Sequence, residues 1–126
     1  MIEVLIVEDN AEFREMLRAI VQSGFPGAGI ALAEEGEAAL RKIKARKPDL
    51  VFMDIRMPGR SGIVIAEEIK ERHPDIIVAF LTNMDGSEYR KAAFARGADF
   101  FLSKESVKAE EIQSLVEGII AKISDQ

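Results

Sequence analysis

Cysteine is absent from this chain of 126 residues, which excludes disulfide bonds and thiolate metal sites. The sequence also lacks any apolar run of about 18 residues, the minimum for a membrane-spanning helix. Its first residues do not show the basic and then apolar pattern of a secretory signal. We therefore expect a cytoplasmic protein that makes no contact with a membrane.

An excess of basic residues is missing as well. The chain has 17 Lys and Arg against 22 Asp and Glu, a formal net charge of −5. Nonspecific binding to a nucleic acid depends on a basic face, so we expect no direct nucleic-acid binding by this domain. The hydrophobic share of 48% and the charged share of 31% are ordinary for a globular protein. The length fits one domain over residues 1–126.

Short apolar runs alternate with stretches of helical periodicity along the whole chain. The apolar runs predict strands at residues 2–7, 30–33, 50–53, 76–81 and 100–102. Apolar residues at helical spacing predict a helix after each strand, around residues 13–21, 38–43, 63–69, 89–96 and 112–123. This strict alternation predicts an α/β fold: a doubly wound parallel sheet of five strands with helices on both faces.

Polar residues follow four of the predicted strands. Glu8 and Asp9 follow the first strand, Asp54 the third, Thr82 the fourth, and Lys104 comes shortly after the fifth. In open parallel sheets, ligands bind beyond the carboxyl ends of the strands. We therefore expect these side chains to converge at one edge of the sheet, although they are far apart in sequence.

Three carboxylates at one edge would repel one another, so either their pKa values rise or a cation lies among them. Hard oxygen ligands without nearby His or Cys favour Mg²⁺, with Mn²⁺ as a second candidate, over zinc. A carboxylate facing such a metal can attack phosphorus and form an aspartyl phosphate. Phosphoryl transfer needs mainly alignment and charge neutralisation, which the ammonium of Lys104 and the hydroxyl of Thr82 could assist.

The residues at these strand ends form a set: Glu8-Asp9, Asp54-Ile55-Arg56-Met57-Pro58-Gly59 with Gly62, Thr82-Asn83, and Lys104. This set resembles the receiver domain of response regulators, the phosphoacceptor module of two-component signalling. The resemblance extends over nearly the whole chain and implies a flavodoxin-like strand order, 2-1-3-4-5. It implies a signalling domain that assists its own phosphorylation and dephosphorylation, and not an enzyme in its own right.

By this resemblance Asp54 is the phosphoacceptor, and Thr82 and Lys104 contact the phosphoryl group. Phe101 matches the aromatic switch position of the family. Because phenylalanine has no hydroxyl to hold it outward in solvent, we expect its inward orientation to be populated even without phosphate. Arg56 and Met84, two residues beyond Asp54 and Thr82, are expected to shield the phosphoryl group from water.

The same resemblance implies a metal site for Mg²⁺. Asp9 is expected to be a direct ligand together with Asp54, and Glu8 to act through a water molecule. The backbone carbonyl of Arg56 is expected to be a further ligand.

The resemblance also implies partners. A sensor histidine kinase or a phosphotransfer protein would donate the phosphoryl group. The surface of the fourth helix, fifth strand and fifth helix would contact an output protein or form a homodimer.

Two details of the sequence depart from the common family pattern. Glu105 follows Lys104 where the family often has proline, which predicts a trans peptide bond there. Asn83 follows Thr82 where a small residue is common, and with Lys104-Glu105-Ser106 it resembles receivers that carry helix-turn-helix outputs. The alternative interpretation is therefore a receiver module from a longer DNA-binding transcriptional regulator.

Taken one at a time, these residues also allow plainer interpretations. Glu8-Asp9 could simply cap the first helix, and Thr82 could cap the fourth. Lys104 could be a solvated loop lysine, and Phe101 could be core filling alone.

Other functions on a similar fold fit the sequence less well. A dehalogenase-like phosphatase needs a second Asp two residues after its nucleophile, where this chain has Arg56. A flavin carrier needs a phosphate-binding loop after the first strand, where Glu8-Asp9 would repel phosphate. A nucleotide hydrolase needs a Gly-rich loop ending in Lys-Ser or Lys-Thr, which is absent.

Overall fold

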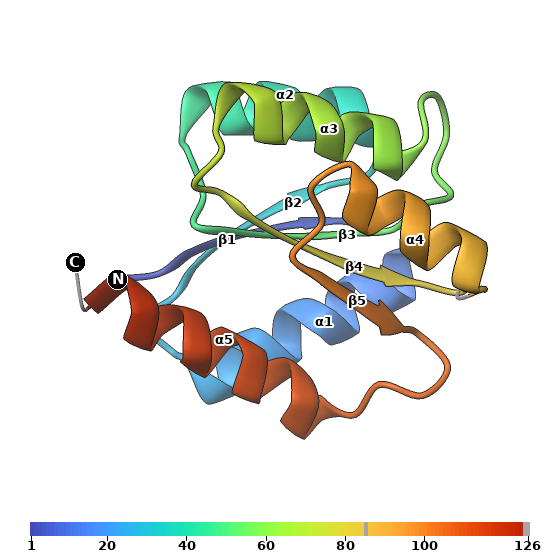
Figure 1. Ribbon diagram of the computed structural model, residues 1–126. Helices are drawn as coiled ribbons and strands as arrows, with labels where there is room; N and C mark the ends of the chain where they lie inside the picture. The colour runs from blue at the N-terminus through green and yellow to red at the C-terminus, as the bar shows by residue number, and fades with distance from the viewer. Residues whose placement is uncertain (85, 125–126) are drawn as a thin grey trace.

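A parallel sheet between two layers of helices makes up the computed structural model, which describes residues 1–84 and 86–124 (Figure 1). The strands lie in the order β2-β1-β3-β4-β5. Their bounds are β1 (Glu3–Val7), β2 (Gly29–Ala33), β3 (Leu50–Met53), β4 (Ile77–Thr82) and β5 (Phe100–Ser103). The expected α/β class, the doubly wound parallel sheet and the 2-1-3-4-5 order are all confirmed.

Helices cover both faces of this sheet. On one face lie α1 (Ala11–Gly24) and α5 (Ala109–Ser124); on the other lie α2 (Gly36–Ala45), α3 (Gly62–Arg72) and α4 (Ser87–Ala95) (Figure 1). The five predicted helices are confirmed, with boundaries that differ by a few residues. The differences arise because capping groups, and not apolar residues, begin and end a helix.

Alternate residues of each central strand pack into two separate cores. Leu5 and Val7 of β1 belong to the core beneath α2, α3 and α4, whereas Val4 and Ile6 belong to the core beneath α1 and α5. Successive side chains of a strand point to opposite faces of a sheet, so a strand covered on both sides must be apolar throughout. Phe52 of β3, for example, is almost completely buried.

The strand pairing brings the strand-end residues to one edge of the sheet. Asp54 directly follows β3, and its backbone N–H donates to the carbonyl of Val7, at the end of β1, at 3.3 Å. The backbone N–H of Lys104 donates to the carbonyl of Thr82, at the end of β4, at 3.0 Å. Glu8 follows Val7 directly, so the residues after β1, β3 and β5 come together beyond the carboxyl ends of the strands.

Two of the plainer capping interpretations are wrong. Asn10, and not Glu8-Asp9, is the N-cap of α1, because its Oδ1 accepts the backbone N–H of Phe13 at 2.8 Å. Gly86 is the N-cap of α4, so Thr82 does not cap that helix. The acidic pair and the threonine are therefore available for another role.

The structure also shows the isomer of one peptide bond and the lengths of the helices. The peptide bond between Lys104 and Glu105 is trans, as expected for a bond that does not precede proline. Within the described residues, none of the helices combines the length and the apolar character needed to cross a membrane.

Candidate functional site

Three carboxylates lie together beyond the carboxyl ends of the strands. Glu8 and Asp9 follow β1, Asp54 follows β3, and one oxygen of each lies within 4.8 Å of the others. Glu8 and Asp54 are buried, with 3% and 7% of their surface exposed, whereas Asp9 is exposed. The predicted convergence of these residues is confirmed. Like charges at this spacing repel strongly in a poorly solvated site, so the cluster needs a compensating cation.

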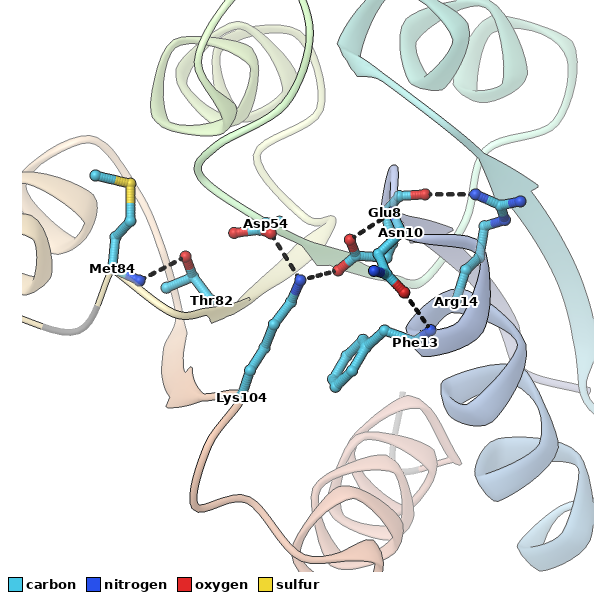
Figure 2. Close-up of polar contacts among 8 residues, drawn as sticks. All are labelled: Glu8, Asn10, Phe13, Arg14, Asp54, Thr82, Met84 and Lys104. Carbon is cyan, nitrogen blue, oxygen red and sulfur yellow. Dashed lines mark hydrogen bonds and ion pairs between the residues drawn. The ribbon is translucent and has the colours of Figure 1, made fainter.

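Lys104 supplies a positive charge inside the cluster. Its Nζ lies 2.8 Å from Oδ2 of Asp54 and 2.5 Å from Oε1 of Glu8. Figure 2 shows the ammonium group between these two carboxylates. Only 11% of the Lys104 side chain is exposed, so the interpretation as a solvated loop lysine is wrong. This single side chain connects the segment after β5 to the ends of β1 and β3.

Burial and close hydrogen bonding change two pKa values in this cluster. Burial raises the pKa of Glu8 above its ordinary value of 4.5, and hydrogen bonds from Lys104 and the Asn10 backbone offset this rise only in part. Burial acts to lower the pKa of Lys104, but hydrogen bonds to Asp54 and Glu8 outweigh it, so the pKa lies above the ordinary 10.5. Lys104 is therefore charged at neutral pH. The expected rise in a carboxyl pKa is therefore present at Glu8, and Lys104 places one positive charge among the carboxylates; a metal ion there stays a prediction.

One buried oxygen of the cluster has no partner. Oδ1 of Asp54 is buried and makes no hydrogen bond within residues 1–84 and 86–124. An unpaired buried carboxylate oxygen is costly, so this oxygen is a suitable ligand atom for a cation. The surrounding donor atoms are carboxylate oxygens, the ligands that Mg²⁺ and Mn²⁺ prefer. The residues present thus fit a hard divalent cation.

Arg56 follows in the same loop with an exposed side chain, and ligation by its backbone carbonyl stays a prediction.

The first turn of α1 holds Glu8 in position. Oε2 of Glu8 accepts the backbone N–H of Asn10 at 3.0 Å, and the Glu8 backbone carbonyl accepts Nη1 of Arg14 at 2.8 Å. Arg14 also forms an ion pair with Glu34, beyond the end of β2, at 3.5 Å. Glu8 is therefore fixed through both its carboxylate and its backbone.

The ring of Phe13 forms one wall beside Lys104. The Lys104 Nζ lies 4.7 Å from the ring centroid, within the range of a cation–π contact. Figure 2 shows the ring and the lysine side by side, with the carboxylates beyond them. Asn10 carries a sequence signal, since asparagine before an apolar helical pattern is a typical N-cap. The contacts of Phe13 and Arg14 carry no such signal, because they depend on which segments meet in the fold.

Thr82 ends β4 and is fully buried, with 0% of its surface exposed. Its Oγ1 accepts the backbone N–H of Met84 at 3.1 Å (Figure 2). A hydroxyl that accepts one hydrogen bond can still donate its own proton to another acceptor. Thr82 therefore has the chemistry for the role expected of it, and a contact with a phosphoryl group stays a prediction.

The ring of Phe101 is buried on β5, with 8% of the residue exposed. Its centroid lies 6.3 Å from that of Phe80 and 6.4 Å from that of Phe94. Arg90 of α4 lies over the rings of Phe101 and Phe94, with its guanidinium carbon 5.8 Å from the Phe101 centroid and 5.2 Å from the Phe94 centroid. Arg90 Nη1 also donates to the Phe101 carbonyl at 3.4 Å. The inward orientation is thus the one that the structure has, and Arg90 is an additional contact without a sequence signal.

The arrangement as a whole suits attack by a carboxylate on phosphorus. Asp54 offers an unpaired oxygen, Lys104 supplies a fixed positive charge, and the acidic cluster suits a divalent cation. Phosphoryl transfer demands little beyond such alignment and charge neutralisation. Arg56 cannot act as the general acid that a dehalogenase-like phosphatase needs at its position, because a guanidinium does not give up its proton near neutral pH.

Comparison with known proteins gives a consistent result. The sequence profile of the response regulator receiver domain matches residues 4–117. The chain is 34% identical over 119 residues to the chemotaxis protein CheY of Halobacterium salinarum, covering 94% of this chain and 98% of that protein. The receiver domain of NtrX from Brucella abortus has a similar structure, with a TM-score of 0.84, 29% identity, and coverage of 94% of this chain and 98% of that one.

Some relatives are much longer than this chain. The DNA-binding transcriptional regulator NtrC of Escherichia coli (strain K12) is 30% identical over 125 residues. That match covers 98% of this chain but only 26% of NtrC, so the chain spans about a quarter of that relative's length. The similarity to NtrC thus concerns a single part of a larger protein.

Proposed function

This chain belongs to the family of response regulator receiver domains, and from that membership and its acidic site we propose that Asp54 accepts a phosphoryl group in a Mg²⁺-dependent reaction. The observation that carries the proposal is the unpaired, buried Oδ1 of Asp54 beside the ammonium of Lys104. The donor is a sensor histidine kinase or a phosphotransfer protein, and the reaction takes place in the cytoplasm. The chain is a signalling domain, and its part in the chemistry is to assist its own phosphorylation and dephosphorylation.

Asp9 and Asp54 would hold the metal directly, Glu8 through a water molecule, and Arg56 through its backbone carbonyl. Bound Mg²⁺ supplies positive charge that neutralises phosphoryl oxygens. The orientation of Glu8 supports the indirect role, since the backbone N–H of Asn10 already holds one of its two carboxylate oxygens. Mn²⁺ has the same ligand preference and could replace Mg²⁺.

The transfer itself forms one bond and breaks one bond. A carboxylate oxygen of Asp54 attacks phosphorus, and the bond from phosphorus to the donor histidine nitrogen breaks, so that the imidazole leaves with its electron pair. Lys104 then pairs with a phosphoryl oxygen, and the Thr82 hydroxyl donates a hydrogen bond to another. Both groups begin close to this position, because Lys104 is already bonded to Asp54 and Thr82 lies at the end of the adjacent strand.

The signal leaves through the surface formed by α4, β5 and α5. Thr82 precedes α4, and Phe101 lies on β5 beneath Arg90 of α4, so a movement of Thr82 can reach this surface. An output protein, or a second copy of the chain in a homodimer, binds there. The domain does not itself bind nucleic acid, consistent with its net charge of −5. The similarity to NtrC fits the alternative that the chain is the receiver module of a longer DNA-binding regulator, whereas the similarity to CheY, over 98% of its length, fits a free-standing regulator.

Phosphorylation can be tested directly by intact-mass spectrometry. Incubation with acetyl phosphate and Mg²⁺ should add one phosphoryl group, and EDTA should prevent the addition. Asp54→Asn should remain unmodified, whereas the surface control Asp75→Asn, whose carboxylate forms an exposed ion pair with Lys47, should be modified like the wild type. A phosphoryl group found on the Asp54→Asn protein would falsify the assignment.

A further inference from the structure

The face of the Phe13 ring is turned to the ammonium group of Lys104 in the acidic site. We propose that Phe13 is a positioning residue of that site: its ring holds the Lys104 ammonium while Lys104 exchanges its carboxylate partners for a phosphoryl oxygen. The inference rests on the proposed function of Asp54. It assigns Phe13 a role in the reaction although the ring itself touches no reacting atom.

The first turn of α1 fixes where the ring lies. Asn10 accepts the backbone N–H of Phe13 at its Oδ1, at 2.8 Å, and donates its own backbone N–H to Oε2 of Glu8, at 3.0 Å. Glu8 in turn contacts Lys104 through Oε1, and the Lys104 Nζ lies 4.7 Å from the Phe13 ring centroid. These four residues form a closed ring of contacts, which can be followed in Figure 2. The position of the Phe13 ring is therefore coupled to that of the acidic cluster.

Among the described residues, Lys104 has three contacts around its ammonium group, and the contact with Asp54 must change on phosphorylation. Oδ2 of Asp54 and Oε1 of Glu8 hold it in the structure, at 2.8 Å and 2.5 Å. Glu8 and Asp54 also belong to the carboxylate set that suits a divalent cation. Phosphorylation converts Asp54 into a group with a new arrangement of oxygens, to which Lys104 must turn. The Phe13 ring is the contact that neither binds a metal nor takes part in the transfer.

An aromatic ring suits this task for a physical reason. The ring attracts a cation electrostatically although the ring itself carries no net charge. It therefore does not compete with the phosphoryl group for the ammonium. The contact tolerates sliding of the ammonium over the ring face, which a single hydrogen bond does not. Only 11% of the Lys104 side chain is exposed, so the contact is largely shielded from water. Cation–π attraction is strongest when the cation is shielded in this way.

The plainer explanation is that Phe13 only fills space. It is half-buried and packs against the core shared by α1 and α5, so any large apolar side chain could serve there. The two explanations predict different effects when leucine replaces Phe13. Leucine would preserve the packing but remove the aromatic face, whereas tyrosine would keep the face.

A direct test is the position of Lys104 in solution. In NMR spectra of the wild type, the ε-methylene protons of Lys104 should be shifted upfield by the ring, both before and after addition of beryllofluoride with Mg²⁺. Phe13→Leu should abolish the shift and Phe13→Tyr should retain it. An unshifted Lys104 methylene in the beryllofluoride state would overturn the proposal, because the ring would not hold the ammonium once its partners have changed.

The functional test is a double-mutant cycle with intact mass as the readout, since the chain has no tryptophan to report by fluorescence. At saturating Mg²⁺, Phe13→Leu should slow phosphorylation of Asp54 by acetyl phosphate about three- to fivefold, the size expected of one cation–π contact. Phe13→Tyr should restore the wild-type rate. In a Lys104→Met background, Phe13→Leu should have no further effect, because there is no cation left to position.

The outcomes separate this inference from the proposed function. If the wild type is phosphorylated on Asp54 and Phe13→Leu reacts at the same rate, the role of Phe13 is refuted and the proposed function stands. If Phe13→Leu slows the reaction equally in both backgrounds, Phe13 acts through packing and not through Lys104. If the wild type takes up no phosphoryl group, the proposed function and this inference both fail. A thermal melt of each variant should show folded protein, which keeps these comparisons valid.

Discussion

Gly62 lies directly against the backbone of Asp54. A Cβ atom at residue 62 would lie 2.0 Å from the Asp54 carbonyl oxygen, far inside van der Waals contact. The Gly62 N–H also donates to the carbonyl of Ile55 at 2.8 Å, so the start of α3 is seated on the loop that carries Asp54. Because the obstructing atom is backbone, it cannot move aside without moving Asp54.

Gly62→Ala should therefore displace Asp54 as well as destabilise the fold. We expect the free energy of unfolding to fall by about 1–3 kcal/mol, as for other overpacked sites, and phosphorylation by acetyl phosphate to slow. Gly118→Ala is a matched control, since Gly118 lies within α5 with no atom near its would-be Cβ. That control should be stabilised by up to about 1 kcal/mol through its better helix propensity. Urea unfolding measures both effects, and a Gly62→Ala protein as stable and as reactive as the wild type would show that the loop adjusts freely.

Metal binding should distinguish the two acidic residues after β1. Asp9→Ala should weaken Mg²⁺ binding much more than Glu8→Ala, because direct ligation outweighs a link through water; loss of an outer-sphere group typically costs about 10–100-fold. Glu12→Ala, an exposed acidic residue in the first turn of α1, controls for the loss of one nearby negative charge. Isothermal titration calorimetry measures the Mg²⁺ affinity of each variant and shows which substitution weakens binding more. Wild-type affinity in both Asp9→Ala and Glu8→Ala would place the metal elsewhere.

Stability should depend on pH through Glu8. Because its pKa in the folded state lies above the ordinary 4.5, the folded protein binds this proton more tightly than the unfolded chain. The contribution of Glu8 to stability is then fully present below about pH 4.5 and is lost as pH rises through the folded-state pKa. Glu8→Gln cannot titrate, so without metal its stability relative to the wild type should increase as pH rises from 4.5 towards neutrality.

Urea denaturation in EDTA over that range measures the effect. Lys104 adds no pH dependence there, since its pKa is raised above 10.5 and it stays charged throughout. A constant stability difference between Glu8→Gln and the wild type at every pH would mean that burial does not perturb Glu8.

Much of the fold follows from local patterns, and the exceptions have physical causes. The strand at residues 50–53 was predicted with its observed limits, because four apolar residues lie between Pro48-Asp49 and the acidic Asp54. The helix α4 was placed less accurately, at residues 89–96 instead of Ser87–Ala95. Its N-cap is Gly86, which makes no side-chain capping bond, so the sequence carries no start signal.

In the candidate site, too, some contacts follow from the sequence and others do not. That Asp54 and Lys104 would meet follows from topology, because the carboxyl ends of parallel strands share one edge. That Lys104 would also bind Glu8 and lie against Phe13 does not follow, since it depends on rotamers and on how α1 sits on the sheet. The position of Arg90 over Phe101 cannot be predicted from the sequence either, because no periodic pattern relates a helix surface to a ring on the neighbouring strand.

The phosphoryl group should be shielded by residues at the mouth of the site. Arg56 is exposed two residues beyond Asp54, where its guanidinium can reach over a phosphoryl group. Met84 is half-buried beside Thr82 and offers attacking water no strong hydrogen bond. Arg56→Asn should speed hydrolysis of the phosphoaspartate by up to about tenfold, equivalent to about 1.4 kcal/mol of barrier. Decay of the phosphorylated mass measures the lifetime, with the exposed Arg41→Asn as a control; an unchanged or longer lifetime in Arg56→Asn refutes shielding.

Phosphorylation should alter the surface formed by α4, β5 and α5. When the Thr82 hydroxyl moves toward a phosphoryl oxygen, the Met84 N–H that it accepts at 3.1 Å either follows or loses this bond, and in both cases the segment leading to α4 must adjust. Phe101 is already inward between Phe80 and Phe94, so the change cannot consist mainly of burying its ring. We expect instead that α4 shifts over a stationary ring, and that the Arg90 contacts shift with it.

Beryllofluoride with Mg²⁺, a mimic of the phosphoryl group, should therefore change NMR shifts from Asp54 out to residues around Tyr89, Phe101 and Ser106. Thr82→Ala should still bind the mimic but show smaller distant changes, because the hydroxyl that couples Asp54 to α4 is gone. Arg90→Met should keep the changes at the Asp54 pocket and at Thr82 but reduce those at Phe101, since methionine preserves the apolar stem and removes the cation. If wild-type shifts stay confined to the Asp54 pocket, the domain does not signal through this surface, and neither Thr82 nor Phe101 acts as a switch.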